Sequence, residues 1–248
     1  MSGLDWLIAR PVAHRGLHDA ARGVIENTPS AFAAAAAANY AIECDLQISA
    51  DGEAMVTHDD ALGRLTEGSG RLDAMTAAEL KRVPYRATAD RMITLGELCE
   101  LVASRVTLVV EVKSHFDGDR QLVKRMAEVL SSYSGPVVGM SFDPDQVVAL
   151  REIMPKLTRG IVAQRSYDDG YWAKLTKAQR DTMLHLKHGF RTQPHFVAYS
   201  VQQLPAPPPW IARNVFGCPL LAWTVRTPEQ RATAARSADQ MIFEGFTP

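Results

Sequence analysis

The 248-residue chain lacks several features that would place it in other protein classes. Its three cysteines are widely spaced and none belongs to a Cys-x-x-Cys pair, which argues against a disulfide scaffold or a zinc ribbon. No apolar run approaches the roughly 18 residues of a membrane span, and the N-terminus does not resemble a signal peptide. We therefore expect a cytoplasmic protein with reduced thiols.

Excess charge of one sign is also missing. The formal net charge is −1, and no run of Lys or Arg is longer than two. We therefore expect no nucleic-acid partner and no stable membrane association. No repeat of about 20–50 residues appears, which excludes solenoids and propellers.

What the chain does contain is an alternation of β-rich runs and helix-like stretches. The β-rich runs are Val12–His14, Ala41–Ile48, Ala54–Thr57, Val106–Val112, Val137–Met140, Thr158–Ala163, Phe196–Ser200, Leu220–Val225 and Gln240–Phe243. The helix-like stretches are Ser30–Ala38, Ala77–Arg82, Thr94–Ser104, Gln121–Ser131, Pro144–Met154, Lys177–His188 and Pro228–Ala235. Strands separated by helices indicate a parallel sheet. We interpret the proline-rich Pro205–Pro209 as an extended linker or a rigid turn.

The Asp51-Gly52 pair is a hairpin turn signal, and it decides the strand count. Because too few residues separate the flanking runs for a parallel crossover, Ile48–Val56 should be an antiparallel hairpin. Without its return strand, eight of the nine runs are left, the number that closes a (β/α)8 TIM barrel. We expect one barrel domain over 1–248, with a small insertion after strand 2 that forms a cap over about 47–91. The hairpin also places residue 44 opposite residue 58.

Carboxylates end two of the expected barrel strands. Glu43 and Asp45 are two residues apart, so they share one face of their strand. The alternative is that this face is exposed, with burial of the opposite face alone. Glu111 ends an apolar strand, where an unpaired carboxylate would cost several kcal/mol; the alternative is a simple Glu111–Lys113 ion pair.

In a barrel, the second and third parallel strands are neighbours, so these three carboxylates would meet. A site with only carboxylate ligands favours a hard divalent cation. We therefore expect Mg²⁺ or Ca²⁺, with Mn²⁺ as a further candidate.

Two of the seven histidines, His14 and His58, should converge on the carboxylates. A lone histidine is more often a packed residue, but a pair with a pKa near ~6.5 can supply both a base and an acid. Arg15 offers a planar two-pronged donor for phosphate oxygens. Gly16 allows the loop to approach its surroundings closely.

Three further residues each allow two interpretations. Glu26 and Asn27 are either turn residues before a Thr28 helix cap or members of the site. Trp223 is either a large core residue at a strand end or a surface on which substrate stacks.

In their order and spacing, the motifs resemble those of the glycerophosphodiester phosphodiesterases. The residues that carry the resemblance are His14-Arg15-Gly16, Glu26-Asn27-Thr28, Glu43-x-Asp45, Asp51-Gly52, His58-Asp59, Leu62-x-Arg64-x-Thr66, Glu111-x-Lys113 and Trp223-Thr224-Val225. The match is dense over 13–70, clear at 111–113, and thin from about 165 to 215.

The resemblance implies a barrel with an insertion after strand 2 and metal-dependent hydrolysis of a glycerophosphodiester to glycerol 3-phosphate and an alcohol. It implies the following roles: metal ligands Glu43, Asp45 and Glu111; acid/base pair His14 and His58; phosphate-binding Arg15 and Lys113; supporting Glu26, with Asn27 in the same motif.

One departure from the family pattern lies at the expected mouth of the barrel. The last strand leads into Glu244, where many members have a Thr-Asp pair. Two alternative functions stay open: a lysophospholipase D-type activity on lipids, and a non-catalytic barrel that binds phosphorylated small molecules. The segment 60–91 has few large apolar residues, which favours a soluble head group. The sequence does not define the oligomeric state.

Overall fold

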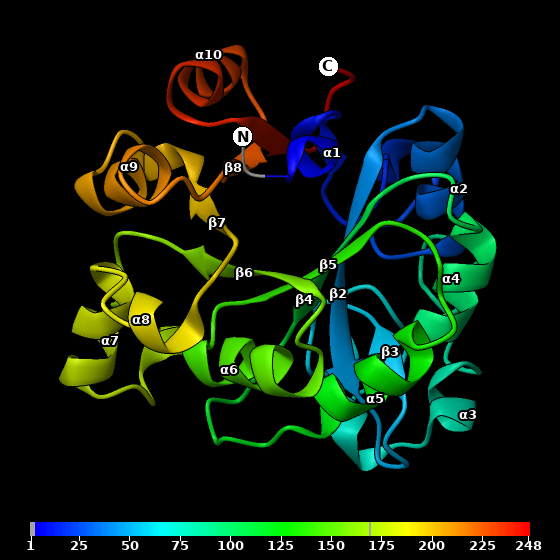
Figure 1. Ribbon diagram of the computed structural model, residues 1–248. Helices are drawn as coiled ribbons and strands as arrows, with labels where there is room; N and C mark the ends of the chain where they lie inside the picture. Colours follow the sequence, from blue (N-terminus) through cyan, green and yellow to red (C-terminus); the bar gives the residue numbers. More distant parts are fainter. Residues whose placement is uncertain (1–2, 169) are drawn as a thin grey trace.

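The structure is a computed structural model that describes residues 3–168 and 170–248 (Figure 1). Its strands are β1 (Val12–Ala13), β2 (Ala41–Ile48), β3 (Ala54–Val56), β4 (Leu108–Val112), β5 (Val137–Ser141), β6 (Thr158–Ala163), β7 (Phe196–Ser200), β8 (Leu220–Val225) and β9 (Gln240–Phe243). All but β3 pair in parallel, and β1 pairs with both β2 and β9. The sheet is therefore a closed TIM barrel, as predicted, with β3 added to β2.

Helices surround the barrel (Figure 1). They are α1 (Asp5–Ile8), α2 (Pro29–Ala37), α3 (Ala77–Leu80), α4 (Leu95–Val102), α5 (Gln121–Leu130), α6 (Pro144–Ile153), α7 (Lys177–Leu184), α8 (Gly189–Thr192), α9 (Pro207–Asn214) and α10 (Pro228–Ser237). Short 3-10 helices are η1 (Ala20–Arg22), η2 (Leu72–Ala74), η3 (Gly170–Trp172) and η4 (Val201–Gln203).

The structure corrects two expectations about helices. The stretch Pro205–Pro209 is not a linker, because its last three prolines form the first turn of α9. Proline is tolerated there because the first backbone N–H groups of a helix have no intrahelical acceptor. The expected helix Lys177–His188 ends at Leu184, and a separate short helix, α8, follows.

Local sequence explains how the helices begin. Thr94 and Thr227 cap α4 and α10, and each accepts a hydrogen bond from the backbone N–H three residues later. In each case a Glu or Gln at that position reaches back to the backbone of the threonine, which completes a capping box. These caps place helix starts directly after the carboxyl ends of the strands or the insertion.

The barrel is filled by side chains from alternating strand positions and is closed at one end by α1. The interior cluster consists of Leu7, Val12, Ala41, Val109, Val138, Met140, Val162, Phe196, Ala198, Leu221 and Ile242. Leu7 is fully buried in it, and Leu4 and Ile8 pack against it. The N-terminal helix thus covers the barrel floor.

The insertion after β2 has a small core of its own. The antiparallel register Leu46↔Val56, continued by the hydrogen bond from the Thr57 N–H to the Asp45 carbonyl, agrees with the prediction that residue 44 lies opposite residue 58. The fully buried Met55 of β3 packs with Leu80, Tyr85 and Met92, which follow the hairpin. This core fixes the segment beside the barrel mouth.

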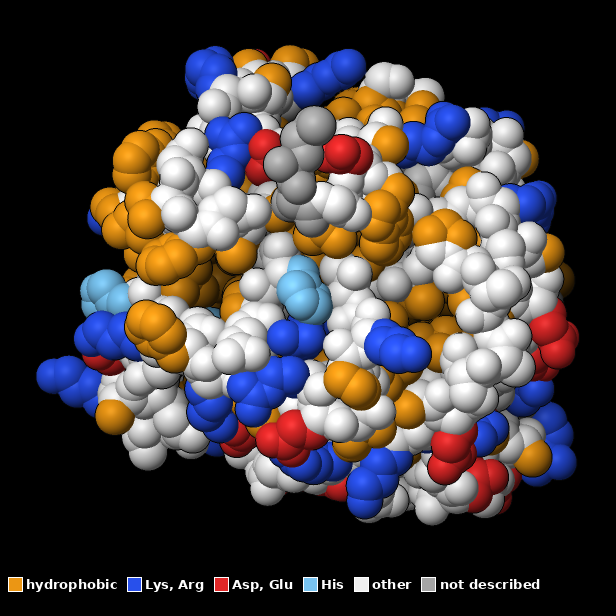
Figure 2. Space-filling model, in the orientation of Figure 1, with side chains coloured by type: hydrophobic (Ala, Val, Ile, Leu, Met, Phe, Trp, Pro, Cys, Tyr) orange, Lys and Arg blue, Asp and Glu red, His pale blue; other side chains and the backbone are white. Residues whose placement is uncertain are grey.

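The surface carries Lys, Arg, Asp and Glu intermingled, with hydrophobic side chains gathered over α8 and α9 at the left of Figure 2. Exposed apolar residues there are Phe190, Trp210, Ile211, Val215 and Phe216. Within residues 3–168 and 170–248, no helix has the length and apolar character needed to span a membrane.

Candidate active site

Every residue predicted for the site lies at or beside the carboxyl ends of the barrel strands. His14 follows β1, Glu43 and Asp45 lie in β2, Glu111 lies in β4, and Trp223 lies in β8. The carboxyl ends of the strands are where TIM barrels build their active sites.

The three predicted carboxylates form one buried group. Glu43 and Asp45 are each 1% exposed and Glu111 is 7% exposed. Their oxygen atoms lie within 4.8 Å of one another, a spacing that allows a single divalent cation to contact all three. The alternative of an exposed strand face is wrong, because both faces of β2 are buried: one faces the barrel interior and the other faces the helices.

Two cations lie against these carboxylates. Lys113 Nζ is 2.7 Å from both Asp45 Oδ1 and Glu111 Oε1, and Arg15 Nε is 3.2 Å from Asp45 Oδ2. Burial raises the pKa of Asp45, but the charges of Lys113 and Arg15 outweigh burial and hold this pKa well below its usual range. Glu111 thus forms the ion pair with Lys113 that the alternative interpretation predicted. It is at the same time a member of the carboxylate group.

The negative charge of Glu43 is opposed by fewer positive groups than that of Asp45. Burial, followed by the charges of Asp45 and Glu111, raises its pKa well above the usual range. A hydrogen bond of 2.8 Å from the Arg15 backbone N–H opposes this shift only in part. The donor set is therefore short of positive charge, which fits a site for a divalent cation.

The loop after β1 is shaped to reach Glu43. Arg15 has a φ of 54° and Gly16 a φ of 84°, both in the left-handed region. A Cβ on Gly16 would lie 2.8 Å from the Cβ of Ala31, so only glycine fits against α2. The loop thus makes the close approach expected at Gly16, and the element that it approaches is α2.

Glu26 and Asn27 belong to the site. The Asn27 side-chain amide donates to Asp45 Oδ2 at 2.9 Å, and Asn27 is 2% exposed. Glu26 Oε1 lies 2.6 Å from Arg15 Nη1 and 2.7 Å from Arg64 Nη2. Asn27 thus orients a carboxylate, and Glu26 orients the Arg15 guanidinium.

His58 stands at the end of the hairpin and lines the same cavity as His14, Glu43 and Glu111. Its Nδ1 is 2.9 Å from Asp59 Oδ1, and Arg64 Nε donates to Asp59 Oδ2 at 2.5 Å. Burial alone would raise the pKa of Asp59, but the hydrogen bonds from His58 and Arg64 lower it to about 2. Sequence reasoning missed this role of Asp59 and Arg64, although both stand in the motifs that it singled out.

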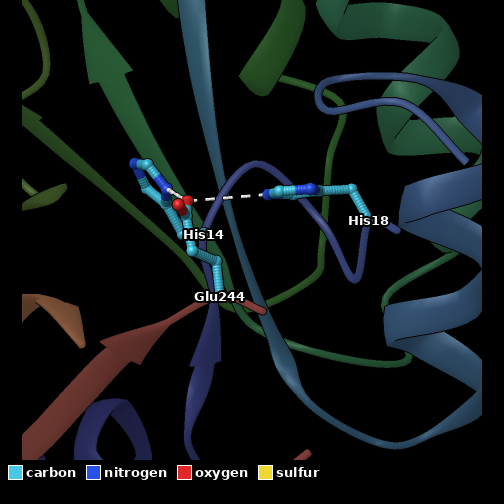
Figure 3. A group of neighbouring side chains, drawn as sticks. All are labelled: His14, His18 and Glu244. Atoms are coloured by element: carbon cyan, nitrogen blue, oxygen red, sulfur yellow. Dashed lines mark hydrogen bonds and ion pairs between the residues drawn. The ribbon is translucent and has the colours of Figure 1, made fainter. Parts of the chain in front are cut away.

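His14 has an unexpected partner in Glu244, which follows the last strand of the barrel. Figure 3 shows its ring directed at Glu244, with His18 on the other side of that carboxylate. His14 Nδ1 is 2.5 Å from Glu244 Oε2, and His18 Nε2 is 3.6 Å from the same oxygen. Burial lowers the pKa of His14 and the hydrogen bond to Glu244 opposes this effect. The sequence placed Glu244 at the mouth but gave no sign of its contact with His14.

These residues border a cavity of about 300 Å³. On the side away from the carboxylates, the cavity is lined by Phe142, Gln164, Gln203 and Trp223. The Trp223 ring packs edge-on against Phe142 at 5.5 Å, and its buried Nε1 has no hydrogen-bond partner among the described residues. The Trp223 ring is thus packed against a neighbour, while its indole N–H is a hydrogen-bond donor at the cavity.

A second, larger hollow adjoins the first. It has a volume of about 660 Å³, shares His58 and Lys113 with the cavity, and lies between the insertion and the segment after β6. The side chains at its edge include the polar Gln47, Asp60, Ser114 and His115. The two spaces therefore meet at one of the two cations and one of the two candidate acid/base residues.

Comparison with known proteins agrees with this geometry. The model of the glycerophosphoryl diester phosphodiesterase family matches residues 14–245. The glycerophosphodiester phosphodiesterase of Caldanaerobacter subterraneus is 30% identical over 165 residues, which are 62% of this chain and 66% of the relative. Bovine glycerophosphodiester phosphodiesterase 1 is 31% identical over 153 residues, which are 57% of this chain and 45% of the relative. The match therefore spans about two thirds of the first relative and less than half of the second.

Solved structures share the fold. An Oleispira antarctica phosphodiesterase in complex with the product sn-glycerol-3-phosphate superposes with a TM-score of 0.76 at 20% identity, covering 94% of this chain and 91% of that one. A Thermotoga maritima glycerophosphodiester phosphodiesterase gives a TM-score of 0.70 at 23% identity, covering 94% of each chain. Because the family model matches nearly the whole sequence, the chain belongs to the glycerophosphoryl diester phosphodiesterase family.

Proposed function

We propose that this protein hydrolyses glycerophosphodiesters to glycerol 3-phosphate and an alcohol. The observation that carries the proposal is a group of three buried carboxylates, paired with two cations, beside a cavity that both histidines line. The family relationship and the product bound to the Oleispira antarctica enzyme support the same substrate class.

In this proposal, Glu43, Asp45 and Glu111 hold a divalent cation, Mg²⁺ or Ca²⁺, with Mn²⁺ as a further candidate. When bound, the cation would neutralise charge on a non-bridging phosphate oxygen. Lys113 and Arg15 stabilise the charge that develops on the remaining phosphate oxygens. Asn27 and Glu26 hold Asp45 and Arg15 in place for these tasks.

His14 and His58 carry the proton transfers. One removes the proton of the nucleophile and the other protonates the leaving alkoxide. The nucleophile is either water or a glycerol hydroxyl, which would first give a cyclic phosphate. Rapid quenching followed by ³¹P NMR tells these apart, because only the second route passes through a cyclic phosphate.

The two adjoining hollows match the two halves of the substrate. The smaller cavity, with the Trp223 indole N–H, suits the glycerol moiety. The larger hollow beside the insertion suits the alcohol. We propose that residues 1–248 act as one domain in which the segment 47–91 caps the alcohol side.

The proposal is tested by turnover of a panel of water-soluble glycerophosphodiesters with Mg²⁺, Ca²⁺ and Mn²⁺, with glycerol 3-phosphate as the product measured. We expect turnover of at least one compound. Binding of the panel without any turnover would instead favour a non-catalytic barrel.

A lysophospholipase D-type activity is the second candidate on the same site. The polar side chains of Asp60, Ser114 and His115 at the edge of the larger hollow favour a soluble head group over an acyl chain. Side-by-side turnover of glycerophosphocholine and lysophosphatidylcholine compares the two, and we expect the first to be faster.

Replacement of either histidine tests the proton transfers. We expect His14→Ala and His58→Ala each to lower kcat by about 10²–10⁴-fold, because each removes a general acid or base. Circular dichroism should show an intact fold. Near-native kcat in either variant would refute its assignment.

A further inference from the structure

We propose that Glu244 is a positioning residue that holds the proton of neutral His14 on Nδ1, so that the unprotonated Nε2 faces the phosphate site. This inference rests on the proposed function, because it assigns the working atom of a proposed acid/base residue. It also makes a statement about His14 that can be checked without any turnover.

The contact geometry defines which ring nitrogen faces which group. His14 Nδ1 lies 2.5 Å from Glu244 Oε2, while Nε2 points the opposite way, 3.9 Å from Glu43 Oε2 (Figure 3). An ionised carboxylate can only accept hydrogen bonds. Nδ1 must therefore be the donor, which leaves Nε2 of the neutral ring as the acceptor at the site.

Glu244 is itself held in the ionised form. Arg226 Nε donates to its other oxygen, Oε1, at 2.5 Å. Burial alone would raise the pKa of Glu244, but the hydrogen bonds from His14 and Arg226, with His18 close by, hold it well below its usual range. The backbone N–H of Glu244 donates to the Val225 carbonyl at 3.1 Å, which fixes the segment after β9 to the end of β8.

The same arrangement occurs at the other histidine. His58 Nδ1 meets Asp59 Oδ1 at 2.9 Å, and Arg64 holds the second oxygen of that carboxylate. Each candidate acid/base residue thus has a carboxylate at Nδ1 that is anchored by an arginine. At His58 the carboxylate is the next residue in the chain, whereas at His14 it comes from the opposite end of the sequence.

A bound cation is the competing explanation for this cluster. One ligand atom each of His14, His18 and Glu244 lie within 4.8 Å of one another. However, the Arg226 guanidinium already occupies Glu244 and adds positive charge beside the group. The hydrogen-bonded dyad therefore accounts for the geometry without an ion.

Steady-state kinetics test the role of Glu244. Glu244→Gln keeps the shape of the side chain but removes the charge that demands a donor at Nδ1. We expect kcat to fall by about 10–100-fold, as for other residues that orient a functional histidine, with KM changed less than about threefold. The matched control is Glu229→Gln on exposed α10, which should leave both constants unchanged. An unchanged kcat, or a change in KM alone, would overturn the inference.

Nuclear magnetic resonance tests the tautomer in the unmodified protein. With ¹⁵N-labelled histidine at about pH 8, where a histidine is usually neutral, the His14 signal is identified by its loss in His14→Gln. We expect the proton on Nδ1 in the wild type and a mixture of tautomers in Glu244→Gln.

Two results of the spectroscopy would overturn the inference: a proton on Nε2 in the wild type, or coordination of added Zn²⁺ by His14 Nδ1 and His18. If instead the wild type shows the expected tautomer but no turnover of any substrate, the proposed function fails while the positioning by Glu244 stands.

Discussion

At the scale of single residues, the carboxylates of the site differ in how many positive charges and hydrogen-bond donors oppose their negative charge. The Asp45 carboxylate contacts Lys113, Arg15 and the Asn27 amide. The Glu43 carboxylate, in contrast, accepts one backbone hydrogen bond. The difference separates their pKa values in opposite directions, although both side chains are buried. Such a split is typical of functional sites and matches a group that could bind a cation.

The raised pKa of Glu43 predicts how cation affinity depends on pH. Burial and the neighbouring Asp45 and Glu111 favour the protonated form, and this proton must leave before a cation can bind. Affinity should therefore rise with pH until Glu43 is ionised, by at most about tenfold per pH unit for one released proton. Calorimetric titration with Mg²⁺ or Mn²⁺ at several pH values measures this. A pH-independent dissociation constant would contradict the assignment of Glu43.

Arg64 gives a residue-scale prediction outside the carboxylate group. Arg64 contacts both Glu26 and Asp59, the carboxylates that hold Arg15 and His58. Arg64→Met should therefore release both residues and lower kcat by about tenfold. The side chain is 46% exposed, so unfolding free energy should change by less than about 1 kcal/mol.

The matched control for Arg64 is Arg86→Met in the same segment. Arg86 is 49% exposed and pairs with Glu67, away from both histidines. Equal loss of activity in the two variants would show that the effect is general to the insertion.

At the scale of elements, the strands were predictable because each is a short apolar run bounded by turn or cap residues. All nine predicted runs are strands, and the Asp51-Gly52 turn correctly separates the hairpin strand from the barrel. Pro207–Asn214 was missed because a run of prolines has no helical periodicity, although proline suits a first turn. The predicted boundary of α7 failed because polar and apolar residues continue at helical spacing past Leu184.

The proximity of the Glu43 and Asp45 carboxylates to His58 was predictable from the sequence, whereas the contact of Glu244 with His14 was not. Glu43, Asp45 and His58 are joined by one hairpin, so local register places them together. Glu244 meets His14 only because the last strand closes the barrel against the first, 230 positions away. No spacing in the sequence reports such a contact.

The junction of α7 and α8 carries a pH-dependent element of stability. Burial, with a contribution from the Arg191 charge, lowers the pKa of His188 from 6.5 to about 4. Because the folded state binds this proton less readily than the unfolded chain, the contribution is present above pH 6.5 and is lost as pH falls toward 4. The loss should amount to roughly 3 kcal/mol.

Urea unfolding between these pH values tests the role of His188. We expect a His188→Gln variant to lose less unfolding free energy than the wild type as pH falls over this range. Parallel curves for the two proteins would show that another group causes the acid sensitivity.

At the scale of the whole molecule, barrel closure converts residues scattered over the sequence into one site. His14 follows one strand, Glu43, Glu111 and Trp223 lie in three others, and all four line one cavity, while α1 covers the opposite end. The fold class could be derived from strand number and alternation. The substrate's alcohol could not, because we propose that it binds in a hollow whose shape is set by the insertion and the segment after β6.

The central claim is that the buried carboxylates hold a cation on which phosphodiester hydrolysis depends. Its most direct test is the turnover of glycerophosphocholine, followed by ³¹P NMR, with protein dialysed against EDTA and then supplied with Mg²⁺, Ca²⁺ or Mn²⁺. We predict no glycerol 3-phosphate from the dialysed protein and restored turnover with at least one of the cations. Full turnover in metal-free buffer would contradict the account.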